Sequence, residues 1–332
     1  MGKQKLSEIP EISEISEISK ESGKSRSTVS KVLRGCPGVT EETRRVVLLA
    51  ADRIDRTCKE RGMREICAIL PDNPKYFWKP ARSVISAYTD RVSLKVYSSI
   101  GSGSDSDVVA RYVRESVDAG ARALILASRP DEALRAVLSE YADRVLILQM
   151  CEYVDVPNTF FIGSDGYGDG MRLGALVKPC GDRPVRVGVP YGDGSYLSDQ
   201  RIGGFLKGLP PEAEVYRVKD PDNRELYSAC LARAIHQIGA PLDYLFCCDG
   251  VTASACEALY KLKDTMKARL LGFEYPKAAE KYMHGGWIAA LLVQDPAAQL
   301  REAIALAERY TESGMFPDRK FHYLQSNSVT GD

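Results

Sequence analysis

Nine short apolar runs, each five to seven residues long, alternate with amphipathic segments from residue 66 onward. The runs are ICAIL, SLKVYSS, ALILAS, VLILQM, TFFIGS, VRVGVPY, YLFCCD, RLLGF and IAALLVQ. The segments between them, such as DPAAQLREAIALAERYTESG, repeat their apolar residues every three or four positions. Continuous apolar strands separated by amphipathic helices are typical of parallel sheets that carry helices on both faces. The pattern therefore predicts a doubly wound α/β fold.

This α/β region covers residues 66–330, which is longer than a single sheet of this kind usually requires. We expect it to divide into two lobes, each built on its own parallel sheet. The predicted lobe 1 comprises residues 66–158 and 289–318, and the predicted lobe 2 comprises residues 159–288 and 319–330.

Residues 1–55 show another pattern, which predicts three short helices. Ile15 and Ile18 can share one face of the first helix, and Gly23 then ends it because glycine tolerates positive φ. Ser25 is suited to cap the second helix, and Thr40 the third. The residues expected in the core of these helices are Val29, Val32, Leu33, Val46 or Val47, Ala50 and Ile54. A polar, charged linker is predicted over residues 56–65.

The second predicted helix has a basic outer face, although the whole chain carries 45 basic and 45 acidic residues. Seven basic residues stand against three acidic ones between positions 20 and 45. The DNA major groove accepts one α-helix, whose N-terminal side chains reach base edges while nearby Lys and Arg contact phosphates. Arg26, Ser27 and Lys31 occupy the corresponding positions. A basic amphipathic helix is also commonly an ordinary solvated surface, so spacing alone leaves both interpretations open.

The amino-acid sequence around the second predicted helix favours DNA binding. SGKSRSTVSKVLRGCPGVTEETRRVV resembles the N-terminal helix-turn-helix of the lactose-repressor (LacI/GalR) family, whose pattern is approximately AGVSxxTVSRVLNxxxxVSxxTRxRV. The identical positions include Gly23, Ser25, Thr28, Val29, Ser30, Val32, Leu33, Val39, Thr43 and Arg44. The resemblance implies that Arg26, Ser27 and Lys31 read bases and that Thr28 and Ser30 contact phosphates. The complete set of DNA-binding residues that it implies is Ser25, Arg26, Ser27, Thr28, Ser30, Lys31 and Arg34.

The linker departs from the same family. Family members place YxPNxxAxxL after the third helix, where a hinge helix wedges a leucine into the minor groove, and DRTCKERGMRE does not match that motif. Met63 is either a substitute wedge or an ordinary linker residue. The sequence therefore predicts a family-like DNA-binding head without the family hinge.

Polar residues follow several of the predicted strands, as in PDNPKYFWKP, GDGSYLSDQR and CDG. Ligands of open α/β sheets bind at the carboxyl ends of the strands. These positions also resemble the periplasmic-sugar-receptor-like effector domain of lactose-repressor relatives. That resemblance implies a pocket formed by Asn73, Asp165, Arg201, Asn223, Asp249 and Gln294, with Phe77 and Trp78 as stacking residues. Tyr76 is a less certain stacking candidate, because the loop before it is one residue longer than in ribose-receptor relatives.

The chemistry of this set suits a small polyhydroxylated ligand, a sugar or a derivative. Carboxylates and amides bind vicinal hydroxyls, arginine spans two oxygens, and an aromatic face packs on the apolar face of a sugar ring. Arg201 is also compatible with a phosphate or carboxylate group, and a purine-like ligand is an alternative within the family.

Composition narrows the remaining possibilities. The chain has no run of about 18 apolar residues and no signal-peptide pattern at its N-terminus, so we expect a cytoplasmic protein without a membrane partner. Nine scattered cysteines without CxxC and three separated histidines predict reduced thiols, no metal site and no cofactor. GSDGYGDGMRLG lacks the spacing of a nucleotide-binding motif and is interpreted as a loop, and we find no catalytic Ser/His/Asp arrangement.

These observations predict a transcription regulator whose affinity for operator DNA is controlled by the ligand. We expect this regulator to be a repressor. One recognition helix covers half a site, so a homodimer on palindromic double-stranded DNA is expected. The alternatives are a stand-alone sugar-binding receptor and an α/β enzyme that acts on a sugar or nucleotide.

Overall fold

A computed structural model of the chain describes residues 18–33, 38–40, 42–51, 65–98, 105–129, 131–179, 181–191, 195–221 and 225–331. The chain forms two compact units, Met1–Arg64 and Glu65–Asp332, and each is described by itself.

The described residues of the N-terminal unit form three short helical stretches, at 18–22, at α2 (Arg26–Leu33) and at 42–51. Gly23 adopts φ of +64° between the first two. The Ser25 hydroxyl accepts a hydrogen bond from the amide of Thr28 at 3.2 Å, and Thr40 does the same for Thr43 at 3.3 Å. The core consists of Ile18, Val29, Val32, Val47 and Ala50. The predicted turn, caps and helix core are present, while Ile15, Ile54 and residues 56–64 of the linker lie outside the described residues.

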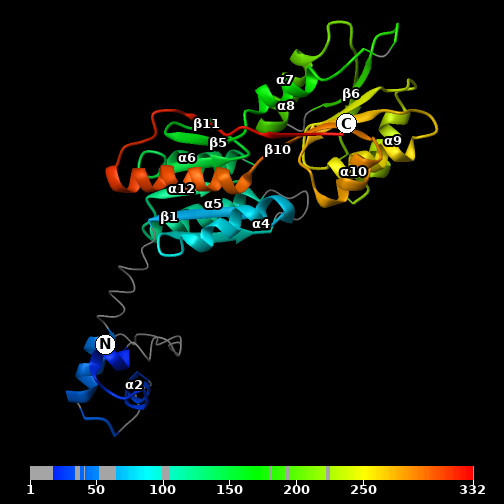
Figure 1. Cartoon of the computed structure of the whole chain (residues 1–332). Helices are drawn as coiled ribbons and strands as arrows, with labels where there is room; N and C mark the ends of the chain where they lie inside the picture. Colours follow the sequence, from blue (N-terminus) through cyan, green and yellow to red (C-terminus); the bar gives the residue numbers. More distant parts are fainter. Residues whose placement is uncertain are drawn as a thin grey trace. The chain divides into compact units, whose positions relative to one another are not determined.

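Lobe 1 of the second unit contains a six-stranded sheet in the order β11-β5-β4-β3-β1-β2. Its strands and helices are β1 (Ile66–Pro71), α4 (Lys75–Val84), β2 (Val92–Tyr97), α5 (Ser106–Asp118), β3 (Ala123–Leu126), α6 (Glu132–Tyr141), β4 (Leu146–Met150), β5 (Thr159–Gly163), α12 (Pro296–Ser313) and β11 (Phe321–Tyr323). α4 and α12 cover one face and α5 and α6 the other, with an apolar core on each side. A short 3-10 helix, Ile85–Ala87, follows α4. Figure 1 shows α12 lying along this sheet.

Lobe 2 repeats this plan with a sheet in the order β12-β10-β9-β8-β6-β7. Its elements are α7 (Gly166–Gly174), β6 (Arg186–Tyr191), α8 (Tyr196–Gly208), β7 (Glu214–Lys219), α9 (Tyr227–His236), β8 (Tyr244–Cys247), α10 (Thr252–Lys261), β9 (Arg269–Phe273), a 3-10 helix (Lys277–Ala279), α11 (Glu280–His284), β10 (Ile288–Val293) and β12 (Asn327–Thr330). Apolar cores lie on both faces here too. The two-lobed, doubly wound α/β fold is thus confirmed.

The chain crosses between the sheets three times, after β5, β10 and β11, and these crossings form the hinge. The predicted lobe limits need correction, because they placed β5 and β11 in lobe 2 and β10 in lobe 1. β5 instead pairs in parallel with β4, and β11 with β5, whereas β10 pairs with β9. Hydrogen bonds to the neighbouring strand keep each strand in its sheet along its whole length. The chain therefore leaves the lobe only at the polar residue that follows the strand.

Three strands gave no apolar run in the sequence. β7 buries only one of its six residues, and β11 and β12 bury none. All three lie at sheet edges. β12 is also antiparallel to its neighbour β10, with Val329 opposite Leu291. An edge strand has fewer core-facing residues, so the pattern of apolar residues along its sequence is weak.

Candidate functional site

α2 presents a polar surface in the N-terminal unit. Arg26, Ser27 and Lys31 are exposed, while Thr28 and Ser30 are half-buried on its flank. Val29 and Val32 lie on the opposite side, in the core. Ser25 is occupied as the helix cap, with hydroxyl contacts of 2.9 Å to both Ser27 and Thr28. Arg34 lies outside the described residues. The predicted polar residues Arg26, Ser27 and Lys31 therefore lie on the exposed face of α2.

A second set of polar residues lies between the lobes of the α/β unit, and we call Tyr76, Cys151, Arg201, Asp249 and Glu274 the interlobe site. Tyr76 and Cys151 come from lobe 1, at the start of α4 and just after β4. The other three come from lobe 2, on α8 and just after β8 and β9. Each follows the carboxyl end of a strand, as expected for ligand sites of open α/β sheets.

Close packing of α7 against α8 fixes the position of Arg201. A Cβ atom at Gly170 would lie 2.2 Å from the carbonyl oxygen of Arg201, and one at Gly204 would lie 1.9 Å from that of Tyr167. Glycine is required at such contacts because the helix backbones touch. The stretch GSDGYGDGMRLG, interpreted from sequence as a loop, is therefore mostly helix, and its Gly170 and Gly174 lie against the backbone of α8.

The guanidinium group of Arg201 is buried and only partly satisfied. The residue is 4% exposed, and its Nη1 atom donates to the carbonyl oxygen of Cys248 at 2.9 Å. Its Cζ atom lies 3.7 Å from the centre of the Phe273 ring. Among the described residues, no hydrogen-bond partner reaches its Nε or Nη2 atoms. Two buried N–H donors without partners are costly, so this edge of the guanidinium is a binding position that the protein alone leaves open.

Two carboxylates share the interlobe site with Arg201. Glu274 is 6% exposed and adopts φ of 65° directly after β9. Burial raises the pKa of Glu274, whereas the positive charge of Arg201 and hydrogen bonds from Gln294 lower it. Asp249 is half-buried, and its Oδ1 atom accepts the amide of Val251 at 3.3 Å. The site thus combines a donor-only guanidinium group with two carboxyl groups, whose oxygens can accept hydrogen bonds.

Tyr76 connects lobe 1 to lobe 2 across this site. Its hydroxyl donates to the carbonyl oxygen of Gly250 at 2.8 Å, and the residue remains 39% exposed. Burial of the hydroxyl raises the pKa of Tyr76, and the charges of Glu274 and Asp249 raise it further. The thiol of Cys151 is within electrostatic reach of both Arg201 and Glu274, and burial raises its pKa. Lobe 1 therefore contributes neutral groups.

The expectation that Phe77 and Trp78 stack on a ligand needs correction. Both belong to the lobe 1 core, at 7% and 6% exposed, and their rings meet edge to face with centroids 4.9 Å apart. α4 begins at Lys75, so positions 77, 78 and 81 face the sheet, which leaves Tyr76 facing lobe 2. The aromatic contribution to the site comes from Tyr76.

The remaining predicted pocket residues take different positions. Asn73 is half-buried ahead of α4. Asp165 is exposed and caps α7, accepting the amide of Gly168 at 3.0 Å. Gln294 is 7% exposed, and its amide is bonded to three other side chains. Asn223 lies outside the described residues. The structure therefore brings together Arg201 and Asp249 of the predicted set, with Gln294 behind them.

Sequence reasoning missed Glu274 and Cys151. Both carried an available signal, since each follows an apolar run, RLLGF or VLILQM, at a strand end.

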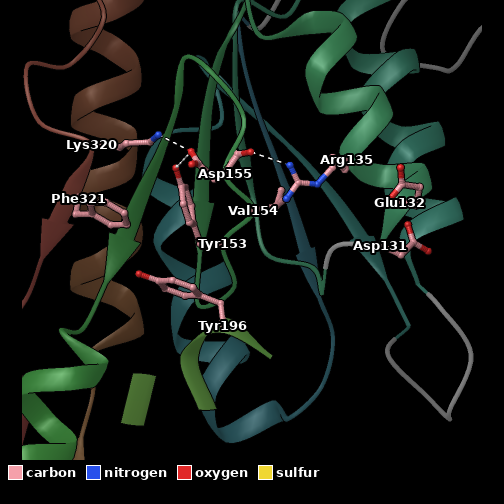
Figure 2. A pocket seen from close by; sticks show the side chains of 9 residues that line it. All are labelled: Asp131, Glu132, Arg135, Tyr153, Val154, Asp155, Tyr196, Lys320 and Phe321. Atoms are coloured by element: carbon pink, nitrogen blue, oxygen red, sulfur yellow. Dashed lines mark hydrogen bonds and ion pairs between the residues drawn. The ribbon is translucent and has the colours of Figure 1, made fainter. Parts of the chain in front are cut away.

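A separate cavity of about 520 Å³ lies beside the start of α8. Figure 2 shows Lys320 and Arg135 reaching Asp155 from opposite sides, with Tyr153 and Tyr196 below. The Nζ atom of Lys320 lies 2.5 Å from Oδ1 of Asp155, and Arg135 donates to its carbonyl at 2.9 Å. Both cations that line this cavity are thus hydrogen-bonded within the protein. It contains none of the interlobe site residues.

Neither a metal site nor a membrane span is found in the part of the chain that the structure describes. No three His, Cys, Asp or Glu residues there are arranged to hold an ion. No helix there is both long enough and apolar enough to cross a membrane.

Residues 66–314 match the family model of the periplasmic binding protein domain. The chain belongs to this family. No curated protein matches the sequence.

Solved structures of similar fold extend this result to three dimensions. A glucose-galactose binding protein, GanP, from Geobacillus stearothermophilus has a TM-score of 0.67 at 15% identity, over 80% of this chain and 97% of its own. The Caulobacter myo-inositol binding protein, bound to myo-inositol, gives 0.66 at 18% identity, over 81% and 93%. A Burkholderia graminis transporter solute-binding protein in complex with D-arabinose gives 0.66 at 15% identity, over 80% and 94%. These likenesses concern the fold.

In this periplasmic binding protein domain, Arg201, Asp249 and Glu274 all belong to lobe 2, and Tyr76 comes from lobe 1. The Nε and Nη2 atoms of Arg201, which have no partner among the described residues, thus belong to a group within electrostatic reach of Glu274 and of Tyr76 and Cys151 from lobe 1.

Proposed function

We propose that the α/β unit binds a small, neutral, polyhydroxylated ligand, a sugar or a related polyol, between its lobes. The observation that carries this proposal is the pair of buried Arg201 donors, Nε and Nη2, without partners among the described residues. A bound oxygen would satisfy them and offset the cost of their burial.

The neighbouring charges favour hydroxyl groups as the source of that oxygen. No described carboxylate lies within ion-pair distance of Arg201, yet Glu274 influences it electrostatically. A hydroxyl can accept from the guanidinium and donate to the carboxylate at the same time. Phosphate and carboxylate groups only accept, and they would be repelled by Glu274 and Asp249. A planar purine also offers fewer such dual groups than a sugar.

The names of the structural relatives support the same ligand class. They describe proteins bound to myo-inositol and to D-arabinose, and a glucose-galactose binding protein.

A thermal-shift screen of the full chain tests the ligand proposal. Neutral monosaccharides and polyols should raise the melting temperature, because a ligand at 100 times its Kd stabilises the folded state by about 2.7 kcal/mol. Sugar phosphates, sugar acids and nucleobases serve as comparison sets. A shift confined to the phosphates or acids would refute the neutral-hydroxyl proposal, and a shift confined to nucleobases would refute a sugar-type site.

We further propose that the protein is a cytoplasmic, homodimeric transcription regulator whose operator affinity changes with ligand. The support is the N-terminal unit, with its glycine turn, capped α2 and exposed Arg26, Ser27 and Lys31. Closure of the lobes on ligand would reorient paired heads, and coupling free energies of this kind are typically about 1–3 kcal/mol. Repression relieved by ligand is the expected sign.

A stand-alone sugar-binding protein is the second candidate, and the comparisons favour it, because the structural relatives described above are binding proteins rather than regulators. Selection of binding sites from random duplex DNA separates the two. A regulator should enrich a palindromic site.

Substitution Lys31→Ala should then lower discrimination between this site and altered sites about tenfold, while salt-dependent binding to any DNA persists. Lys261→Ala, an exposed lysine on α10 of lobe 2, is the matched control and should change nothing. Failure to enrich any sequence would favour the binding-protein alternative. Turnover of a bound sugar would instead support an enzyme.

A further inference from the structure

The separate cavity beside the start of α8 has the size of a ligand site of its own. Its volume of about 520 Å³ is within the range of about 300–1,000 Å³ that is typical of small-molecule pockets. Most of its lining comes from lobe 1, from the start of α6, the segment after β4 and the start of β11. Tyr196, the first residue of α8, comes from lobe 2. This cavity shares no residue with the interlobe site, so the proposed sugar ligand does not account for it.

One wall of this cavity is aromatic. The centre of the Tyr153 ring lies 5.5 Å from that of Tyr196 and 5.2 Å from that of Phe321, and both contacts are edge to face. Tyr153 is 8% exposed, and its hydroxyl donates to Oδ1 of Asp155 at 3.2 Å. Burial raises the pKa of Tyr153 and of Tyr196, so both hydroxyls stay neutral at pH 7. The wall is therefore held in place and suited to an apolar group.

Three of the charged residues in the lining are already engaged within the protein. Lys320 and Asp155 form an ion pair at 2.5 Å. Asp131 caps α6 by accepting the amide of Leu134 at 2.9 Å, and it also accepts the Ser106 hydroxyl. These side chains support the walls of the cavity.

Glu132 and Arg135 remain, one turn apart on α6, and both are exposed. Among the described residues, no hydrogen bond or ion pair engages the Glu132 carboxylate. Arg135 donates to the carbonyl oxygen of Asp155 at 2.9 Å, a neutral acceptor that leaves other N–H groups of the guanidinium able to donate. Residues three apart on a helix have Cβ atoms about 5–6 Å from each other. In Figure 2 these two residues lie on one side of the view, and Tyr153 and Tyr196 on the other.

The charge of the lining limits the ligands that this cavity can take. Three carboxylates stand against two cations, so the lining carries one excess negative charge; these groups are Asp131, Glu132 and Asp155 against Arg135 and Lys320. An anion such as a sugar phosphate would be repelled by that excess. A simple cation would match Glu132 but leave Arg135 without a counter-charge. A zwitterion matches both.

We propose that this cavity is a second binding site, which takes a small zwitterion, an α-amino acid with an apolar side chain. Its ammonium group donates to Glu132, and its carboxylate accepts from the planar guanidinium of Arg135. Its side chain packs on the wall formed by Tyr153 and Tyr196. This inference goes beyond the proposed sugar site, and neither depends on the other.

Ligand-observed NMR titration of the full chain gives the first test. L-Leucine should bind with a Kd on the order of 1 mM, because both ionic contacts are exposed to water. Isoamylamine lacks the carboxylate and isocaproate lacks the ammonium group, and each should bind at least about fivefold more weakly. The proposal fails if L-leucine does not bind, or if either analogue binds as well as L-leucine. This comparison needs no substitution, so it decides even where a variant does not fold.

Substitutions on α6 identify the contacts. Arg135→Gln should weaken L-leucine binding about fivefold without weakening isoamylamine, because that amine has no carboxylate for Arg135 to bind. Glu132→Gln should weaken L-leucine by a similar factor without weakening isocaproate. Glu140→Gln on the same helix and Arg217→Gln on β7 are exposed, matched controls and should change neither. Equal weakening of L-leucine and both analogues would reduce Glu132 and Arg135 to structural residues and overturn the assignment.

Sugars provide the remaining comparison. Neither α6 variant should change the binding of myo-inositol or D-arabinose, because the proposed sugar site contains neither residue. Sugar binding that is lost in both α6 variants would make this cavity a sugar site and overturn the zwitterion proposal. L-Leucine binding that is unchanged in both variants would place that ligand elsewhere and overturn it as well.

Discussion

The lobe 1 and lobe 2 faces of the interlobe site differ in charge and in how firmly neighbouring residues hold their side chains in place. The lobe 2 face carries Arg201, Asp249 and Glu274, and the first and last of these are at most 6% exposed. Arg201 belongs to α8, whose backbone is in close contact with α7, and Glu274 accepts a hydrogen bond from Gln294. The lobe 1 face presents Tyr76, which is 39% exposed and joined to lobe 2 by one hydrogen bond.

This difference indicates a division of roles. Charges that are buried and braced before ligand arrives lose little entropy on binding, so lobe 2 is suited to select the ligand. Breaking the single hydrogen bond of the exposed Tyr76 to lobe 2 costs little free energy, so lobe 1 is suited to move away from lobe 2 and return.

Arg201→Met should produce the largest change in ligand affinity among the variants of the two faces. It removes both open donors and leaves two carboxylates facing the ligand without a cation. The loss of two charge-assisted hydrogen bonds predicts at least about 100-fold weaker binding of a neutral sugar, measured by calorimetry. Arg217→Met, an exposed arginine on β7, is the control and should bind normally. Comparable affinity in the two variants would remove lobe 2 from its selecting role.

Glu274→Gln should have an intermediate effect and a distinct pH signature. It should weaken sugar binding about tenfold, since a hydrogen bond to a charged acceptor becomes neutral. Burial raises the pKa of Glu274 above its ordinary 4.5, despite the opposing influence of Arg201, so the folded protein takes up the proton more readily than the unfolded chain. The free energy of unfolding of the unmodified protein should therefore fall as pH rises from 4.5 through the raised pKa.

Thermal unfolding of the full chain at a series of pH values measures this slope. Arg201, Asp169, Tyr76 and Cys151 also face or influence the carboxylate and are retained in the variant. Glu274→Gln should abolish the fall, and Glu257→Gln, on the exposed face of α10, should preserve it. A slope that survives in Glu274→Gln belongs to another group.

Tyr76→Phe should have the smallest effect. It removes a single hydrogen bond to Gly250, which predicts binding about 3- to 10-fold weaker, with the change expressed mainly as faster ligand release in stopped-flow measurements. Gly250→Ala should act in the same direction, because a Cβ atom there would lie 2.4 Å from the Tyr76 hydroxyl. Tyr260→Phe on α10 is the control. An effect of Tyr76→Phe as large as that of Arg201→Met would erase the proposed difference between the faces.

Most of the fold followed from local pattern, and the errors have a common cause. Strands buried on both faces, such as β1 and β4, read as apolar runs because every residue meets the core. Edge strands β7, β11 and β12 have few core neighbours and left no comparable signal. The glycine-rich sequence of α7 resembled a loop because Gly170 and Gly174 are needed for contact with α8, a partner about thirty residues further along the chain.

For the site, the positions of strand ends in the sequence predicted Arg201 and Asp249. They did not distinguish residues that face the space between the lobes from residues that are bonded or packed within the protein. Gln294 and Phe77 have the composition of ligand contacts, yet one is bonded to three protein side chains and the other packs in the core. One residue of register at the start of α4 decides whether Phe77 or Tyr76 faces lobe 2. Such a choice depends on where the helix begins relative to the sheet.

The amino-acid sequence by itself determined the alternation of strands and helices, the two-lobed α/β class and the capped, glycine-turned helices of the N-terminal unit, because these depend on residues close together in the chain. Only the tertiary structure decided that β5 and β11 stay in lobe 1, that two Arg201 donors have no partner among the described residues, and that Gln294 joins Glu274 to Ser164 and Gln299. Those outcomes depend on distances between residues as far apart in the chain as Phe161 in β5 and Phe321 in β11. Local periodicity carries no information about such distances.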